Sequence, residues 1–145
     1  MLDACRELGV AFVAFSPVAR GYLCGGLTDV STLDAKDIRR AMPRFAPEAY
    51  AANLALLEGY VAIARQVGCS PAQLALAWLL HQGGHIIPIP GTTSVEHLHD
   101  DLGAAGVQLD AATLAALDQA INQQNVVGPR YSAQSASEVD TEAFA

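Results

Sequence analysis

Basic residues and cysteines are both scarce in this chain. Its 145 residues include 8 lysines and arginines against 15 acidic residues, so the formal net charge is -7. A nucleic-acid partner requires a dense basic surface, and we therefore expect none. The three cysteines are Cys5, Cys24 and Cys69. Their odd number and wide spacing match neither a disulfide framework nor a metal site, so we expect reduced thiols.

Long apolar runs are missing as well. The longest run near the amino terminus, Val10–Phe15, is six residues long, whereas a helix that crosses a bilayer needs about 20. The first eight residues carry acids and lack the apolar stretch of a secretory signal. We therefore expect no membrane segment and a cytoplasmic location.

Helical periodicity is what the sequence has in abundance. Its hydrophobic content of 52%, much of it alanine, predicts a packed, helix-rich domain. Ser70 and Gln73 have the spacing of a capping box, as do Thr93 and Glu96. Apolar residues recur at intervals of three and four, which predicts helices over residues 2–8, 48–67, 71–81, 95–103 and 111–121.

Two short apolar segments predict β-strands. Val10–Phe15 lies between Gly9 and Pro17, and Ile86–Ile89 follows a pair of glycines. The first is predicted to be buried on both faces, and the second is predicted to be a buried strand that its prolines limit to a few residues. Helices separate the two segments, which is typical of α/β folds with parallel strands. Two strands cannot close a barrel or cover the edges of a sheet, so we expect a fold that lacks neighbouring strands.

The residues after the first strand are candidate binding residues. In parallel α/β folds, anions and cofactors bind where a strand ends and the next helix begins. Phe15, Ser16, Pro17 and Arg20 supply an aromatic face, a hydroxyl and a cation there. A planar cofactor can stack on the ring and a phosphate can pair with the arginine. The alternative is a core phenylalanine beside a solvated arginine.

Gly91, Thr92, Thr93 and Ser94 follow the second strand. The glycine permits close approach, and the three hydroxyls add donors to the first amides of the next helix. This combination predicts a phosphate pocket. The alternative is that Thr93 or Ser94 simply caps the helix.

Other polar residues carry weaker signals. His81 and His85 are four residues apart and lack a third ligand, so we expect no metal site. The arginines Arg39, Arg40 and Arg44 are more typical of a solvated surface than of an anion site.

Four sequence blocks carry a family resemblance. Together they resemble the aldo-keto reductases, in particular the bacterial and plant branch related to pyridoxal and perakine reductases. The resemblance implies an α/β fold that is the carboxy-terminal portion of an eight-stranded (TIM) barrel, with its last two strands and their helices, and that is incomplete as a barrel. The blocks are Phe15–Leu23 (FSPVARGYL), Asp37–Phe45 (DIRRAMPRF), Ser70–Leu80 (SPAQLALAWLL) and Ile87–Leu98 (IPIPGTTSVEHL).

By this resemblance, the first boundary holds the reactive half of a nicotinamide dinucleotide. Phe15 lies where the family stacks an aromatic residue on the nicotinamide ring. The loop from Ser16 through Pro17 and Val18 to Arg20 lies where the family covers the pyrophosphate.

The second boundary corresponds to the adenosine half of the cofactor. Gly91–Ser94 lies where the family grips the 2'-phosphate, and His97, Asp100 and Asp101 lie on the helix that borders the adenine. NADP is therefore the implied cofactor. NAD is the alternative, because His97 stands where an arginine is common and Asp101 replaces the usual asparagine.

The family's catalytic group has no counterpart in this sequence. It consists of a tyrosine acid with a lysine, an aspartate and a histidine, all from the first half of the barrel. Lys36 lies in a polar segment. The tyrosines that match none of the motif positions are Tyr22, Tyr50, Tyr60 and Tyr131.

These observations favour a fragment of an NADP-dependent aldo-keto reductase, with a partial reductase domain over residues 1–127 and a polar tail over 128–145. Its parent would reduce aldehydes or ketones by hydride transfer, and a carbonyl substrate would bind only to the complete barrel. The alternative is a non-catalytic, cofactor-binding subunit that complements a separate amino-terminal half. We also expect marginal stability or self-association where that half is absent.

Overall fold

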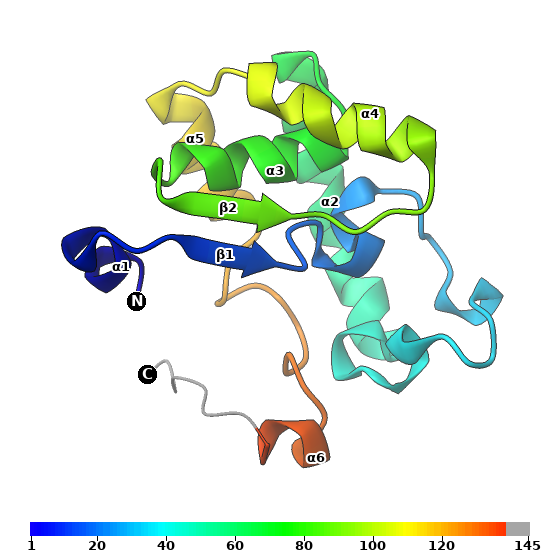
Figure 1. Cartoon of the computed structure of the whole chain (residues 1–145). Coiled ribbons are helices and arrows are strands. Elements are labelled where there is room, and N and C mark those ends of the chain that lie inside the picture. The colour runs from blue at the N-terminus through cyan, green and yellow to red at the C-terminus, as the bar shows by residue number, and fades with distance from the viewer. Residues whose placement is uncertain (139–145) are drawn as a thin grey trace.

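The computed structural model describes residues 1–138 and builds them around a two-stranded parallel sheet (Figure 1). Strand β1 (Phe12–Phe15) pairs with β2 (Ile86–Ile89) in a register that begins with Phe12 opposite Ile86. Because the strands are parallel neighbours, their carboxyl ends lie at the same edge of the sheet. The candidate binding residues follow the strands at this edge.

Helices form most of the remaining structure, and their bounds confirm the predicted helices to within about one residue at each end. A further short helix, α6, lies in the segment expected to be a polar tail. No helix within residues 1–138 is both long enough and apolar enough to cross a membrane. The helices are α1 (Leu2–Leu8), α2 (Pro47–Val67), α3 (Pro71–His81), α4 (Val95–Gly103), α5 (Ala111–Ala120) and α6 (Ala133–Ala136).

The hydrophobic core lies between α2, α3 and α5. Leu74 on α3 is fully buried, and Leu57 on α2 and Leu117 on α5 belong to the same cluster. Figure 1 shows α3 alongside β2, and α4 packs on the side of α3 that faces away from β2. The helices therefore cover the sheet from one side and position its carboxyl edge.

One predicted helix cap is confirmed and another is wrong. The Ser70 Oγ accepts from the backbone N–H of Gln73 at 3.0 Å, and the Gln73 Oε1 accepts from the Ser70 N–H at 3.1 Å. The α4 helix is instead capped by Ser94, whose Oγ accepts from the backbone N–H of His97 at 3.3 Å. Thr93 is displaced from the role because Ser94 is the extended residue directly before the first helical residue.

One face of the sheet is open, so the prediction that the first strand is buried on both faces is wrong. Ile86 is buried on the face toward α3, but within residues 1–138 no layer of structure covers the other face. Strand β1 also begins at Phe12 instead of Val10. The exposed fractions on the open face are 52% for Val13, 52% for Phe15, 49% for Ile87 and 50% for Ile89.

This open apolar face is expected to make the isolated chain self-associate, because water-exposed apolar patches on a sheet attract one another. Sedimentation velocity should show species larger than a monomer at micromolar concentration. The double variant Val13→Ser with Ile87→Ser should shift the distribution toward monomer. Ile38→Ser removes an apolar side chain that is 65% exposed and lies outside the sheet, and it should leave the distribution unchanged. A wild-type chain that stays monomeric would contradict this expectation.

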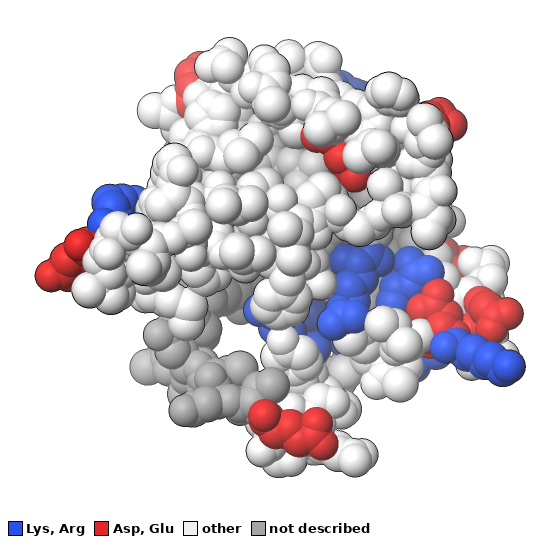
Figure 2. Space-filling view, viewed as in Figure 1, with Lys and Arg blue, Asp and Glu red and all other residues white. Residues whose placement is uncertain are grey.

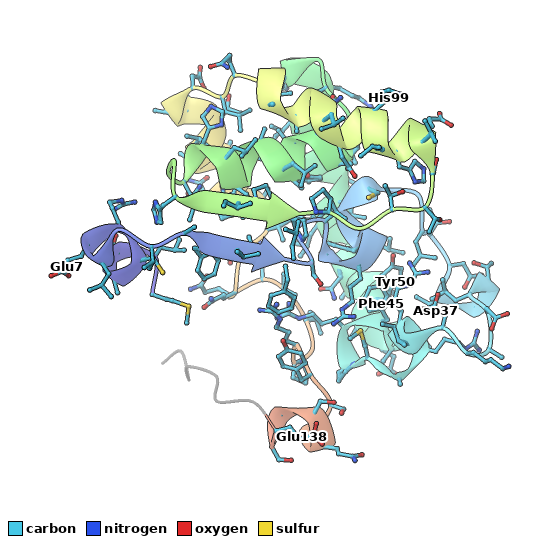
Figure 3. All side chains as sticks on the ribbon, in the orientation of Figure 1. Glu7, Asp37, Phe45, Tyr50, His99 and Glu138 are labelled. Carbon is cyan, nitrogen blue, oxygen red and sulfur yellow. The ribbon has the colours of Figure 1, made fainter. Side chains whose placement is uncertain are left out.

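The segment between β1 and α2 contains four short 3-10 helices. Its last turn is anchored by Phe45, which is buried and stacks on Tyr50 with ring centroids 5.3 Å apart. Figure 3 shows these two labelled side chains next to each other at the start of α2. The turns are η1 (Ala19–Cys24), η2 (Val30–Thr32), η3 (Ile38–Ala41) and η4 (Pro43–Phe45).

The carboxy-terminal segment is tied to α2 by a buried asparagine. The Asn53 Nδ2 donates to the Val127 carbonyl at 3.0 Å, and the Asn53 Oδ1 accepts from the Val127 N–H at 2.8 Å. The Arg44 Nε donates to the carbonyl of Gly128 at 3.1 Å. The two bonds of Asn53 satisfy both polar atoms of its side-chain amide. Together with the Arg44 bond they fix the direction in which the chain continues toward α6.

Candidate functional site

The loop after β1 has an unusual backbone. Ser16, Ala19 and Arg20 have φ angles of 52°, 50° and 57°, and Gly21 follows at 88°. Non-glycine residues rarely adopt this left-handed region, and each costs about 1–3 kcal/mol unless the surroundings hold it. The Ser16 carbonyl accepts from the Ala19 N–H at 2.9 Å, which closes the first tight turn. Strain of this kind gathers at binding loops, and here it lies at the carboxyl end of a strand.

Phe15 presents its ring at the end of β1. The side chain is 52% exposed, and the guanidinium of Arg130 lies 4.8 Å from the ring centroid. A ring held in this way can stack against a planar cation or a planar cofactor ring. Further along the loop the surroundings differ, since Pro17 is buried and Val18 packs against the core. The structure thus leaves Phe15 available and uses Pro17 and Val18 to hold the loop.

Arg20 is positioned by a second arginine. The Arg39 Nη1 donates to the Arg20 carbonyl at 3.2 Å, and the Arg39 Nη2 lies 2.7 Å from the Asp37 Oδ2. The hydrogen bond from Arg39 lowers the pKa of Asp37 to about 2. Arg39 is therefore held by a carboxylate and acts on the backbone of the loop, which leaves the Arg20 side chain to line a cavity beside Ser16.

The second boundary uses its hydroxyls in local hydrogen bonds. The Thr92 Oγ1 accepts from the Ser94 N–H at 3.0 Å, and Ser94 caps α4 as described above. Gly91 and Thr93 are exposed, and a Cβ at Gly91 would meet no heavy atom within 4 Å. The cap alternative therefore holds for Ser94. The Thr92 hydroxyl donates to the Ser94 carbonyl at 3.5 Å. The Ser94 hydroxyl still carries a proton to donate, and Thr93 is open to solvent at the start of the helix.

The acidic residues of α4 have unequal surroundings. The Asp100 carboxylate accepts from the Ser70 hydroxyl at 2.7 Å, so it faces the start of α3. Burial and the neighbouring Asp100 raise the pKa of Asp101, while His97 opposes the shift. Burial, then Asp101 and Asp100, raise the pKa of the Cys24 thiol. Cys24 ends η1, so the structure brings the first loop and α4 together.

Arg44 and Arg130 are site residues that sequence reasoning missed. They lie in the same cavity lining as Ser16 and Arg20. Arg44 was assigned to a solvated surface and Arg130 to the polar tail, because neither follows a strand. The one local signal is the aromatic residue beside each of them, Phe45 and Tyr131. The pairing itself depends on contacts across 84 positions, such as the bond from Arg44 to the backbone near Arg130.

Within residues 1–138, no group of three or more histidine, cysteine, aspartate or glutamate side chains could hold a metal ion. His81 instead joins α3 to the segment before α5, because the Leu109 N–H donates to its Nε2 at 3.3 Å. The residues of the two strand-to-helix boundaries offer stacking, anion binding and hydrogen bonding at one edge of the sheet.

Comparison with known proteins decides the family. Residues 1–122 match the model of the Aldo/keto reductase family. The chain belongs to the aldo-keto reductase family. The aldo-keto reductase yakc [NADP(+)] of Schizosaccharomyces pombe is 38% identical to it over 131 residues, which are 90% of this chain and 38% of the yeast protein. The chain thus spans well under half the length of that relative.

Solved structures of reductases resemble the chain in the same partial way. The glycerol dehydrogenase AKR11B4 from Gluconobacter oxydans matches all of it at a TM-score of 0.74 and 22% identity, over 41% of its own length. The thermostable aldo-keto reductase Tm1743, solved with the inhibitor epalrestat, matches 83% of it at a TM-score of 0.54 and 25% identity, over 33% of its own length. The expected α/β fold of aldo-keto reductase barrels is confirmed, and two parallel strands are consistent with part of such a barrel.

Proposed function

We propose that this chain is the cofactor-binding, carboxy-terminal part of an NADP-dependent aldo-keto reductase that reduces aldehydes or ketones. The observation that carries the proposal is the meeting of two strand-to-helix boundaries at one edge of the sheet, in a chain of this family. β1 and β2 would then be the seventh and eighth strands of the barrel. The proposed parent enzyme belongs to the pyridoxal and perakine reductase-like branch and is cytoplasmic.

The residues at this edge fit a nicotinamide dinucleotide. Phe15 has a half-exposed ring for the nicotinamide, and the strained loop from Ser16 to Arg20 would lie over the pyrophosphate. The first amides of an α-helix have no partner within the helix, so the start of α4 attracts phosphate. Thr93 and the Ser94 hydroxyl stand at that start. The Asp100 carboxylate accepts from the Ser70 hydroxyl, and this bond would hold the helix that borders the adenine.

When bound, the cofactor supplies a hydride to the carbonyl carbon. The residues of this chain would hold the dinucleotide in place, orient its nicotinamide ring against Phe15 and balance its phosphate charge. The proton for the carbonyl oxygen would come from the catalytic tyrosine in the amino-terminal half of the barrel.

Complementation tests this proposal. Residues 1–145 would be co-expressed with the amino-terminal half of an aldo-keto reductase barrel, and oxidation of NADPH by nitrobenzaldehyde would be measured. Restored turnover supports a fragment or a subunit that needs a second half, and a partner half encoded directly upstream favours the subunit. An assembled complex that fails to bind NADPH would remove the cofactor-binding part of the proposal.

The assembled barrel is expected to prefer NADPH over NADH by about tenfold, which corresponds to roughly 1.4 kcal/mol. The preference is modest because His97 stands where related enzymes have an arginine, whose guanidinium binds phosphate with two parallel hydrogen bonds, and Asp101 adds negative charge close by. Fluorescence titration with both cofactors measures it, and His97→Arg should enlarge it. A preference for NADH, or one for NADPH beyond about a thousandfold, would refute this weighing of the two residues.

A further inference from the structure

A cavity of about 210 Å³ beside the end of β1 contains three arginines. They are Arg20, Arg44 and Arg130, and the other lining residues include Ser16 and Phe45. Figure 2 shows basic side chains gathered on this face below the sheet. No carboxylate occurs among the lining residues within the described part of the chain. Such a cavity is a concave, uncompensated positive site in a protein that is acidic overall.

Arg44 is held in this cavity by its neighbours. Its Nε donates to the Gly128 carbonyl, and the adjacent Phe45 is buried against Tyr50. Burial lowers the pKa of Arg44, and the nearby Arg130 lowers it further. The terminal nitrogens of the guanidinium make no hydrogen bond or ion pair with residues 1–138. Two neighbouring cations with free donors favour an anion between them.

Arg130 reaches the cavity from the other side. The hydrogen bonds of Asn53 to Val127 fix the preceding chain. The Arg130 guanidinium lies over the rings of Phe15 and Tyr131, at 4.8 and 5.4 Å from their centroids. Arg130 makes no ion pair within residues 1–138. An anion bound here would lie beside the ring on which the nicotinamide is proposed to stack.

We propose that the arginine cavity, formed by Arg20, Arg44 and Arg130, binds an anionic group of the carbonyl substrate, so that the parent enzyme acts on aldehydes or ketones that carry a carboxylate. This inference rests on the proposed reductase function. Arg20 belongs to the loop expected over the cofactor pyrophosphate and can serve both ligands. Arg44 lies in η4 and Arg130 in the segment after α5, so both are outside the two strand-to-helix boundaries. Substitution of these two arginines therefore distinguishes a substrate carboxylate from the cofactor pyrophosphate.

Calorimetric titration of residues 1–145 with succinate tests the inference without any turnover. Succinate should bind and neutral succinamide should not. Arg44→Gln and Arg130→Gln should each weaken succinate binding by about tenfold, since each removes a charge-assisted hydrogen-bond partner. Arg65→Gln is the matched control, because Arg65 is exposed on α2 and does not line this cavity. Arg130 is exposed and makes no hydrogen bond within residues 1–138, so its variant keeps the test valid if Arg44→Gln fails to fold.

A second titration, in saturating NADP⁺, separates the substrate from the cofactor. Succinate should still bind, because Arg44 and Arg130 lie outside the proposed cofactor subsite. Competitive displacement by NADP⁺ would assign the arginines to the cofactor phosphates and overturn the inference, as would unchanged binding in both arginine variants. A chain that binds NADPH but not succinate refutes this inference alone. A chain that binds succinate but not NADPH refutes the cofactor-binding part of the proposed function.

Discussion

Purified by itself, the chain is expected to oxidise no NADPH with pyridoxal, nitrobenzaldehyde or phenanthrenequinone above a protein-free blank. An aldo-keto reductase needs a tyrosine acid near the nicotinamide, and three tyrosines of this chain, Tyr22, Tyr50 and Tyr60, are otherwise engaged. Burial raises the pKa of Tyr22 to about 12 and also raises the pKa values of Tyr50 and Tyr60, which makes them poorer acids. Their hydroxyls donate to backbone carbonyls of Asn53, Leu27 and Pro71, respectively.

The control for this result is the complemented barrel, assayed at the same concentration of the chain. Recovery of turnover on mixing shows that the isolated chain is folded well enough to contribute its share of the site. Loss of a general acid alone typically lowers the rate of an enzyme by about 10²–10⁴-fold. The rate of the complemented sample is therefore the reference against which any residual activity of the isolated chain is measured. Clear turnover by the chain alone would contradict the assignment of the catalytic group to another segment.

Replacement of Leu74 by alanine is expected to lower the free energy of unfolding by about 2–5 kcal/mol. Leu74 is completely buried on α3, within the cluster that joins α2, α3 and α5. Alanine would leave a cavity there and remove the contacts that hold the three helices against the sheet. Because a single domain of this size has about 5–15 kcal/mol of stability, the loss should appear as a large fall in the urea midpoint.

Leu98→Ala provides the matched comparison. Leu98 lies on α4 and is 48% exposed, so the same chemical change should cost well under half as much. Both variants would be unfolded in urea and followed by circular dichroism at low protein concentration, where self-association is weakest. Equal midpoints for Leu74→Ala and Leu98→Ala would show that the helical cluster is not the stabilising core.

Local sequence signals sufficed for the helices and most of their ends. Gly68 has a φ of 80° and closes α2, as a residue without a Cβ does most easily. Ser70, Pro71 and Gln73 form the predicted start of α3, since a capping box depends on residues three positions apart. The parallel pairing of the strands also followed from the order of elements. The family resemblance added the identity of the binding edge, which periodicity alone does not specify.

The tertiary structure decided what depends on distant partners. The sequence does not reveal that Asp100 bonds to Ser70, or that the chain near Val127 attaches to Asn53, since these contacts join segments 30 and 74 positions apart. The open face of the sheet was also invisible, because an apolar strand has the same sequence whether or not a neighbouring layer covers it. Arg130 shows the difference most clearly. Its sequence neighbours predict a polar tail, and only the folded chain places its charge over the ring of Phe15.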